Sequence, residues 1–166
     1  MFNTVELEVI YEDENILVIN KPSGIEVLDD LNNNLTKLVQ DKYCMNNNFP
    51  YPCHRLDRNT SGIVIFGKTM RALQDLNEMM KKRHCIDKTY LTICKGYMGD
   101  ADLIGYMKKD GDRSLVKVVN EHTPGALMMH TIVEHLEYKN DFSFIKVKLV
   151  TGRTHQIRVH LSSVNH

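Results

Sequence analysis

The first third of the chain alternates short apolar runs with polar turns. Hydrophobic and polar positions alternate over residues 5–12, and residues 16–19 form a short apolar run, so both segments are predicted to be β-strands. Pro22 and Gly24 then end this strand pair, because proline lacks an amide proton and glycine permits positive φ. A weak helical spacing of leucine and valine inside residues 29–50 indicates one short helix between flexible loops.

The middle of the chain predicts a strand, a helix and a second strand. Residues 62–66 are rich in β-branched side chains, which favours a buried strand. Thr69 can cap the helix that follows, whose leucines and methionine share one face and continue the helical pattern to about residue 84. Residues 89–94 alternate again and are predicted to form a strand.

The last third adds further strands and a final helix. Residues 100–125 are predicted to be rich in loops, with glycine and proline as punctuation and one strand at 114–119. Alternation predicts strands at 127–136 and 142–150, and Thr154 can cap a closing helix. The chain has no internal repeat, and many strands with few helices indicate an α+β fold instead of a regular βαβ series.

Length and composition narrow the class of protein. The chain has 166 residues, of which 42% are hydrophobic and 25% charged, as in ordinary globular proteins. This composition argues against intrinsic disorder, and the length predicts one domain over residues 1–166. No apolar run reaches the roughly 18 residues of a membrane span, and the acidic N-terminus lacks the pattern of a signal peptide. We therefore expect a cytoplasmic protein without a membrane partner.

The charged side chains are unevenly distributed along the chain. Lysine and arginine number 21, aspartate and glutamate also 21, so the formal net charge is zero. That balance excludes proteins that bind nucleic acid through overall positive charge alone. Residues 1–50 nevertheless carry a net charge of −6, residues 51–100 one of +4, and residues 101–166 one of +2.

Two patterns suggest chemistry that the sequence does not support. Residues 62–69 match the phosphate-binding pattern G-x-x-x-x-G-K-[ST], but the four intervening residues are strong strand formers and cannot curl around a phosphate. His155 and His160 are candidate metal ligands by residue type. Their spacing of five residues, however, places them well apart on a helix and on opposite faces of a strand, which argues against a shared metal ion. The cysteines form no C-x-x-C pair, which also argues against a metal site. We therefore expect neither a nucleotide hydrolase nor a metal-binding protein.

Two polar segments next to predicted strands are stronger candidates. Residues 51–62 place one carboxylate among two arginines and a histidine on a polar loop directly before a buried strand, where catalytic groups tend to lie. Composition alone favours a surface loop with weak local ion pairs over a catalytic site. Residues 149–160 end a strand in Thr-Gly-Arg and begin a helix, whose free amides suit an anion.

Taken together, four motifs resemble the RluA-like family of RNA pseudouridine synthases, and the resemblance covers residues 8–161. The motifs are the opening strand pair with Lys21-Pro22-Ser23-Gly24, the segment His54-Arg55-Leu56-Asp57-Arg58-Asn59-Thr60-Ser61-Gly62, the tripeptide Lys88-Thr89-Tyr90, and the segment Thr151-Gly152-Arg153-Thr154-His155-Gln156-Ile157-Arg158. This resemblance implies a mixed, mostly antiparallel sheet with flanking helices and a central catalytic cleft. It also implies that the chain acts on ribosomal or transfer RNA.

The resemblance assigns roles to individual residues. It implies that Asp57 is the nucleophile, that Arg153 contacts it, and that Tyr90 stacks on the target base or helps to move the C5 proton. Arg55 would occupy the stack that the flipped uridine leaves, and Leu149 is a candidate wall of the base pocket. The remaining expected RNA contacts lie in the same motifs: His54, Arg58, Thr60, His155, Gln156 and Arg158.

The expected reaction also explains which residues the sequence lacks. Conversion of uridine to pseudouridine consumes no water and changes no oxidation state, so no cofactor is expected. An aspartate is ionised at neutral pH and can attack C1′ or C6 without a base to activate it. Relatives continue past the final helix, so we expect a domain truncated at its C-terminus, without an N-terminal accessory domain. A catalytically inactive RNA-binding protein on the same scaffold is the alternative.

An RNA substrate would explain why positive charge is concentrated after residue 50. We predict that the basic surplus from residue 51 onward lines an RNA-facing cleft and that the acidic segment before it turns away. We expect the protein to act as a monomer.

Overall fold

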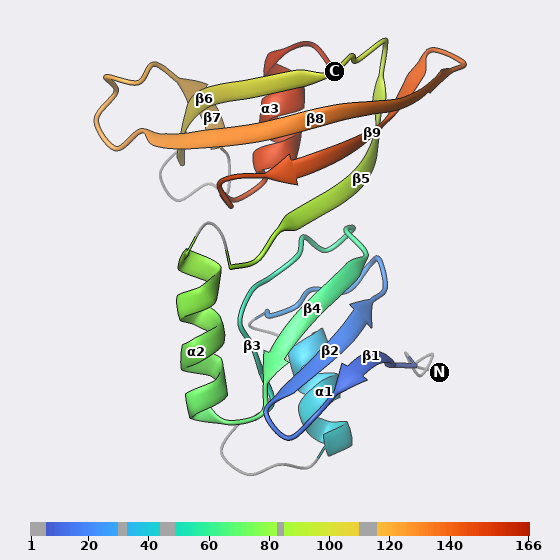
Figure 1. The fold of residues 1–166 in the computed structure, drawn as a ribbon, viewed down its shortest axis with the longest axis vertical. Coiled ribbons are helices and arrows are strands. Elements are labelled where there is room, and N and C mark those ends of the chain that lie inside the picture. Colours follow the sequence, from blue (N-terminus) through green and yellow to red (C-terminus); the bar gives the residue numbers. More distant parts are fainter. Residues whose placement is uncertain (1–5, 30–32, 44–48, 83–84, 110–115) are drawn as a thin grey trace. The chain divides into compact units, whose positions relative to one another are not determined.

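The computed structural model describes residues 6–29, 33–43, 49–82, 85–109 and 116–166 (Figure 1). The chain divides into two compact units, Met1–Cys85 and Ile86–His166. We describe each unit by itself, and the single domain over residues 1–166 stays a prediction. No helix in the described part of the chain is both long enough and apolar enough to cross a membrane.

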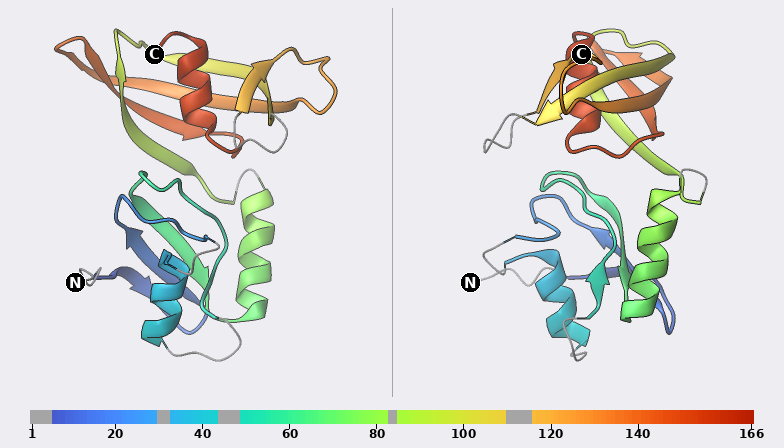
Figure 2. Two further views of the ribbon diagram at one scale, coloured as in Figure 1. Left: turned by 180° about the vertical axis from the view of Figure 1, so that it is seen from behind. Right: turned by 90° about the vertical axis from the view of Figure 1, so that its left-hand side faces the viewer.

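The first unit is a four-stranded antiparallel sheet with two helices. Its strands lie in the order β1-β2-β4-β3. They are β1 (Glu8–Glu12), β2 (Ile16–Lys21), β3 (Tyr51–Pro52) and β4 (Gly62–Gly67), and the helices are α1 (Leu35–Tyr43) and α2 (Met70–Lys81). Figure 2 shows α1 over one face of this sheet, while α2 follows β4 directly and packs against it.

Strand alternation builds the core of the first unit. Leu17 and Ile19 of β2 lie opposite Phe66 and Val64 of β4, and all four side chains are fully buried on one face of the sheet. Ile63, on the other face of β4, is exposed. The period-two pattern therefore decides which side chains of β2 and β4 the fold buries.

The second unit is a five-stranded antiparallel sheet covered on one face by a single helix (Figures 1 and 2). The strand order is β5-β9-β8-β6-β7. The elements are β5 (Lys88–Lys95), β6 (Ala101–Lys109), β7 (Val116–Val119), β8 (Leu127–Lys139), β9 (Phe142–Leu149) and α3 (Gln156–Ser163). Leu161 of α3 packs into a cluster with Val133 of β8 and Val147 of β9, and this cluster is the core of the unit.

Most predicted elements are confirmed, and the α+β fold with mostly antiparallel strands is observed. The side chain of Thr69 caps α2 by accepting a hydrogen bond from the amide of Ala72 at 3.1 Å. β7 begins at Val116, and residues 114 and 115 of the predicted strand lie outside the described residues, as do residues 83 and 84 of the predicted helix. The short β3 had no counterpart among the predicted strands.

Two predictions about the last third are wrong. Residues 101–109 form β6 instead of a loop, and Gly105, taken as punctuation, lies inside that strand. A Cβ at Gly105 would come within 3.1 Å of the Met129 methyl and 3.2 Å of the His160 ring, so this glycine lies at a close packing contact and not at a turn. Thr154 does not cap α3: the cap is His155, in a left-handed conformation and without a side-chain cap bond.

Gly67, the second glycine of the phosphate-loop pattern, has a packing role. Residues 62–67 are strand β4, as the strand-forming side chains indicated, so the pattern forms no phosphate loop. A Cβ at Gly67 would lie 2.7 Å from the amide nitrogen and 2.8 Å from the Cα of Leu73 in α2. The absence of a side chain at this position allows the first turn of α2 to pack directly on the end of β4.

We predict that Gly67→Ala destabilises the protein by about 1–3 kcal/mol, because the helix backbone must move away from the strand to admit one methyl group. The free energy of unfolding in urea measures the effect. Gly99→Ala is the matched control, since its Cβ would come no closer than 3.7 Å to any atom outside its chain neighbours. Equal stability of the two variants would refute the packing role.

Candidate functional site

Asp57 lies on a loop between β3 and β4, here called the Asp57 loop (residues 53–61). The preceding residue, Leu56, is buried and fixes one side of the loop in the core of the first unit. Asp57 itself starts a turn in which its carbonyl oxygen accepts the amide of Thr60 at 3.0 Å. Aspartate is favoured at the first position of such turns. The loop therefore holds the half-buried Asp57 in a defined backbone conformation.

A buried lysine ties the Asp57 loop to the turn after β2. Lys21 has an exposed fraction of 0%. Its Nζ donates to the carbonyl oxygens of Pro22 at 2.9 Å, Ile25 at 2.8 Å and Arg58 at 3.1 Å. An ammonium group has three donors, and all three are used. One side chain thus satisfies backbone groups from two segments 37 residues apart.

Further hydrogen bonds join the same two segments. The amide of Gly24 donates to the carbonyl oxygen of Arg58 at 2.8 Å, and Arg58 Nε donates to the carbonyl oxygen of Gly24 at 3.1 Å. The Ser23 hydroxyl donates to the carbonyl oxygen of Asn59 at 3.0 Å. The Lys-Pro-Ser-Gly segment is therefore the support on which the Asp57 loop is built.

Lys21 also contributes charge near the candidate nucleophile. Burial lowers the pKa of its ammonium group below the ordinary value, and the negative charges of Glu26 and Asp57 oppose this fall. The lysine thus supplies both backbone order and a positive charge to the Asp57 loop.

The predicted RNA contacts on the Asp57 loop differ in their exposure. His54 Nε2 accepts the amide of Ile65 at 3.2 Å, so its ring extends the pairing of β3 with β4. Arg58 is exposed, but its Nε is bound to Gly24 as described. Arg55 has a side chain that is 65% exposed and forms a long 3.5 Å ion pair with Glu26. Arg55 is accordingly a cation of this loop that a polyanion can reach.

In the second unit, Arg153 lies between β9 and α3, on a segment here called the Arg153 loop (residues 150–155). Gln156, at the start of α3, is 2% exposed, and its side chain stabilises this loop through hydrogen bonds. Its Oε1 accepts the amide of Arg153 at 3.0 Å and the hydroxyl of Thr151 at 2.8 Å. Its Nε2 donates to the carbonyl oxygen of His130 at 3.1 Å and to the Thr131 hydroxyl at 2.9 Å.

This network gives Gln156 a structural role instead of the predicted RNA contact. All of its side-chain polar atoms are bonded inside the unit, and almost none of its surface reaches solvent. Leaving any of these buried groups unpaired would cost about 1–3 kcal/mol. We therefore do not retain Gln156 as an RNA-binding residue.

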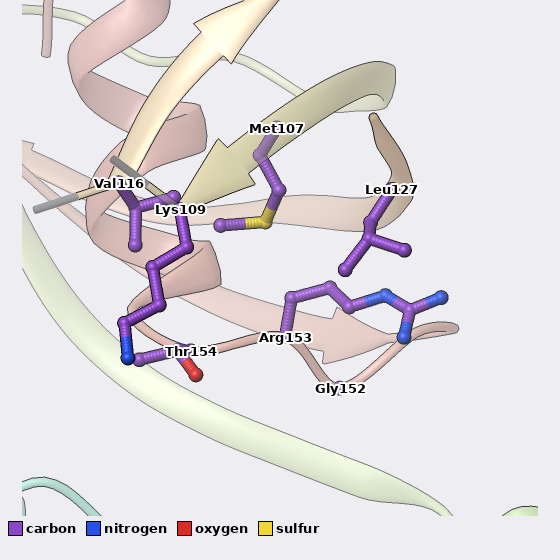
Figure 3. Close-up of a pocket in the computed structure, with 7 residues that line it drawn as sticks. All are labelled: Met107, Lys109, Val116, Leu127, Gly152, Arg153 and Thr154. Carbon is purple, nitrogen blue, oxygen red and sulfur yellow. The ribbon is translucent and has the colours of Figure 1, made fainter. Parts of the chain in front are cut away.

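Arg153 and the residues after it line two hollows of the second unit. Arg153 is exposed, and its Nε donates to the carbonyl oxygen of Met128 at 3.2 Å. With Gly152 and Thr154 it borders a small pocket against β6, β7 and β8 (Figure 3). His155 and the exposed Arg158 border an open groove between α3 and β7.

Tyr90 and Leu149 lie on the same face of the sheet in the second unit. Leu149 pairs with Lys88 across the β5–β9 ladder, so Tyr90, two residues along β5, is its diagonal neighbour. Both side chains are half-buried and pack against the core cluster beneath α3. The structure thus brings together the two residues predicted to contact the target base.

A buried histidine completes the network under the Arg153 loop. His160 Nδ1 lies 2.9 Å from the Thr131 hydroxyl, which also binds Gln156. Burial, and the nearby charge of His130, lower the pKa of His160 below its ordinary value of 6.5. His160 therefore contributes to the network as a neutral side chain.

The comparisons with known proteins agree with these motifs. Residues 15–163 match the model of the RNA pseudouridylate synthase family. The chain belongs to this family. The resemblance drawn from its four motifs is thereby confirmed.

Named relatives cover nearly all of this chain. It is 38% identical over 170 residues to an uncharacterised RNA pseudouridine synthase of Mycoplasma genitalium, covering 95% of this chain and 52% of that protein. It is 35% identical to the mitochondrial tRNA pseudouridine(32) synthase of Saccharomyces cerevisiae, covering 96% of this chain and 35% of that protein. Ribosomal large subunit pseudouridine synthase D of Buchnera aphidicola is 31% identical, with coverages of 98% and 52%. The chain spans about half the length, or less, of these relatives.

The fold is also that of a solved family member. The structure of human RNA pseudouridylate synthase domain containing 1 superposes with a TM-score of 0.80 at 24% identity. The superposition covers 97% of this chain and 66% of the human one. This agreement concerns the fold and confirms the predicted α+β class.

Within this family scaffold, sequence reasoning assigned no role to Lys21 or Lys88. Lys21 continues the alternation of Leu17 and Ile19, so the period-two rule alone would have placed it on the buried face. Lys88 lies beside Gly152, where a Cβ would come within 3.2 Å of its Nζ. No local sequence pattern predicts the contact between Lys88 and Gly152, because it joins strand β5 to the distant Arg153 loop.

We expect Lys21→Met to lower the free energy of unfolding by about 2 kcal/mol, because the carbonyl oxygens of Pro22, Ile25 and Arg58 each lose the hydrogen bond from the buried ammonium group. Methionine keeps the length and apolar stem of lysine, which separates the lost hydrogen bonds from lost packing. Urea unfolding is the measurement. Lys37→Met, at a 48% exposed side chain in an i,i+4 ion pair, should change stability by less than about 0.5 kcal/mol. Similar losses in both variants would contradict the role given to Lys21.

The lowered pKa of His160 predicts a stability that depends on pH. The unfolded chain binds a proton at this histidine near pH 6.5, whereas the folded chain binds it only at lower pH. Stability is therefore expected to fall as the pH drops below about 6.5. In thermal unfolding between pH 7.5 and 5.5, His160→Gln should lose less stability than the unmodified protein.

His122→Gln is the matched control for this measurement. The His122 side chain is 86% exposed, so its replacement should leave the pH profile of the unmodified protein in place. Parallel profiles for all three proteins would show that His160 does not cause the acid destabilisation.

Proposed function

We propose that the protein acts as an RNA pseudouridine synthase that isomerises specific uridines in ribosomal or transfer RNA. The observation that carries the proposal is the hydrogen-bonded support of the Asp57 loop, in which Lys21 and Gly24 both donate to the carbonyl oxygen of Arg58, the residue directly after Asp57. A nucleophile must keep one geometry, and this loop supplies it for a single half-buried carboxylate. Membership of the family and the names of the relatives support the same assignment.

In the proposed reaction, the Asp57 carboxylate is the nucleophile. It attacks either C1′ of the ribose or C6 of the uracil, and the N1–C1′ bond breaks. The base turns and a C5–C1′ bond forms, the bond between Asp57 and the nucleotide breaks to give back the free carboxylate, C5 loses its proton and N1 takes one up. Tyr90 stacks on the base or helps to move the C5 proton, and Arg153 is the cationic partner of Asp57. The reaction needs neither redox change nor water, so no cofactor is proposed.

The target uridine must leave its helix to reach a carboxylate, and the proposal includes this base flipping. Arg55 is proposed to brace the vacated stack, which its exposed side chain permits. His155 and Arg158 along the groove are proposed to bind the RNA backbone, together with Thr60. His54 and Arg58 contribute through the loop that they stabilise. Leu149 is proposed as a wall of the uracil pocket.

The proposal also includes the shape and charge of the RNA-binding surface, the oligomeric state and the cellular location. A central catalytic cleft, an RNA-facing surface formed by the basic surplus after residue 50, and a monomeric state stay predictions from the sequence. A cytoplasmic location is proposed as well.

Asp57→Asn is expected to reduce isomerisation to background, because the amide is not a nucleophile, while RNA binding stays within a few-fold. The assay follows tritium release from C5-labelled uridine in RNA taken from cells that lack the gene. Asp75→Asn, an exposed aspartate on α2, is the matched control and should retain full activity. Turnover by Asp57→Asn would refute the assigned nucleophile.

The same assay separates the enzyme from a catalytically inactive RNA-binding protein. An inactive protein on this scaffold would bind RNA in a salt-dependent manner and release no tritium. Sites that lose pseudouridine when the gene is deleted would identify the RNA and the uridine.

A further inference from the structure

We propose that the pocket beside Arg153 binds one nucleotide of the RNA other than the target uridine. The pocket lies in the second unit, has a volume of about 230 Å³, and is lined by Met107, Lys109, Val116, Leu127, Gly152, Arg153 and Thr154 (Figure 3). This inference rests on the proposed function, because it assumes an RNA ligand. It adds a binding position that none of the predicted catalytic residues except Arg153 occupies.

The inner wall of the pocket is apolar and is formed by three adjacent strands. Met107 of β6 lies opposite Leu127 of β8, and Lys109 of β6 lies opposite Val116 of β7. Met107 is only 3% exposed, so the sheet holds this wall in place before any ligand binds. A thioether and two aliphatic side chains suit the face of a flat ring, since sulfur makes favourable contacts with aromatic rings.

The rim of the pocket is cationic and polar. Lys109 and Arg153 border it from different elements, and Thr154 adds a hydroxyl group (Figure 3). The bond from Arg153 Nε to the Met128 carbonyl oxygen restricts the guanidinium to this side of its loop. A ligand that matches the whole pocket has a flat apolar part and an anionic part, which describes a nucleotide.

The volume limits the ligand to a single base. Sites for drug-sized molecules and cofactors usually enclose about 300–1,000 Å³, so this pocket is too small for a dinucleotide. It is also unsuited to inorganic phosphate alone, which would leave the apolar wall without a contact.

The pocket differs from the position proposed for the target uracil. Tyr90 and Leu149 do not line it. Leu149 pairs with Thr131 on β8, whereas Leu127 lies four residues earlier on that strand. At a rise of about 3.3 Å per residue, the two positions are about 13 Å apart along the sheet. Arg153 follows Leu149 by four residues and borders the pocket, so an RNA strand near the uracil position can place a second base here.

The methyl group of Met107 is a direct probe of this pocket. We expect uridine 5′-monophosphate to shift the ¹³C-methyl resonance of Met107 in a saturable manner, through the ring current of the base. Ribose 5-phosphate has the same charge without the base and should shift it by less than a fifth as much. The Met98 methyl, buried in the core cluster, should not respond. An absent Met107 shift, or an equal shift with ribose 5-phosphate, would overturn the proposal.

Two leucines on β8 provide a matched pair of variants. Leu127→Glu places a negative charge on the pocket wall and should weaken uridine monophosphate binding at least tenfold. Leu136→Glu changes the same residue type at the far end of β8 and should leave the affinity unchanged; the two leucines are 48% and 40% exposed. Equal affinities in both variants would count against the pocket.

A second pair tests the pocket if Leu127→Glu does not fold. Lys109→Gln should weaken binding several-fold, whereas Lys139→Gln, at the end of β8, should not. Tritium release separates failure of this proposal from failure of the proposed function. Isomerisation without a Met107 response would reject the pocket alone. A Met107 response without isomerisation would support the nucleotide site and reject the catalytic function.

Discussion

The first unit depends on one buried ammonium group. Lys21 gives up its hydration and recovers hydrogen bonds from the carbonyl oxygens of Pro22, Ile25 and Arg58. Such a group is stable inside a protein only when every donor is satisfied, so the two segments that supply the acceptors must keep their positions. Asp57 is next to one of these acceptors. Its geometry is therefore a consequence of where the lysine is buried.

The second unit uses the same physical device with a neutral side chain. Gln156 binds the backbone of Arg153 and His130 and the hydroxyls of Thr151 and Thr131, so the Arg153 loop is fixed from beneath by α3 and β8. In both units a buried polar residue orders a loop, and an exposed or half-buried charge on that loop is left to meet a ligand. This arrangement separates the residues that support the chemistry from those proposed to perform it.

That separation changes how the family motifs are understood. Arg55, Arg153 and Arg158 are exposed cations, as expected of residues that meet RNA. His54 and Gln156 lie in the same motifs, but they bind the protein's own backbone. A family motif thus contains both residues expected to contact RNA and residues that stabilise the loop. Only the hydrogen bonds in the structure distinguish the two kinds. The pocket at Met107 is the opposite case, because it is formed by residues outside every motif except the Arg153 loop.

The sequence by itself determined the features that depend on neighbours along the chain. A short apolar run predicted β2, a run rich in β-branched side chains predicted β4, and alternation predicted β9. A threonine before an apolar stripe predicted the cap of α2. The resemblance of four motifs to those of a known family predicted the family. Only the tertiary structure decided that Gly105 belongs to a strand, where it pairs with Met129 of β8 and packs close to the His160 ring, 55 residues along the chain. The tertiary structure also decided that Lys21 donates to the Arg58 carbonyl oxygen and that Gln156 binds His130 and Thr131 of β8. Such contacts depend on which segments pack together, and a local pattern carries no record of them.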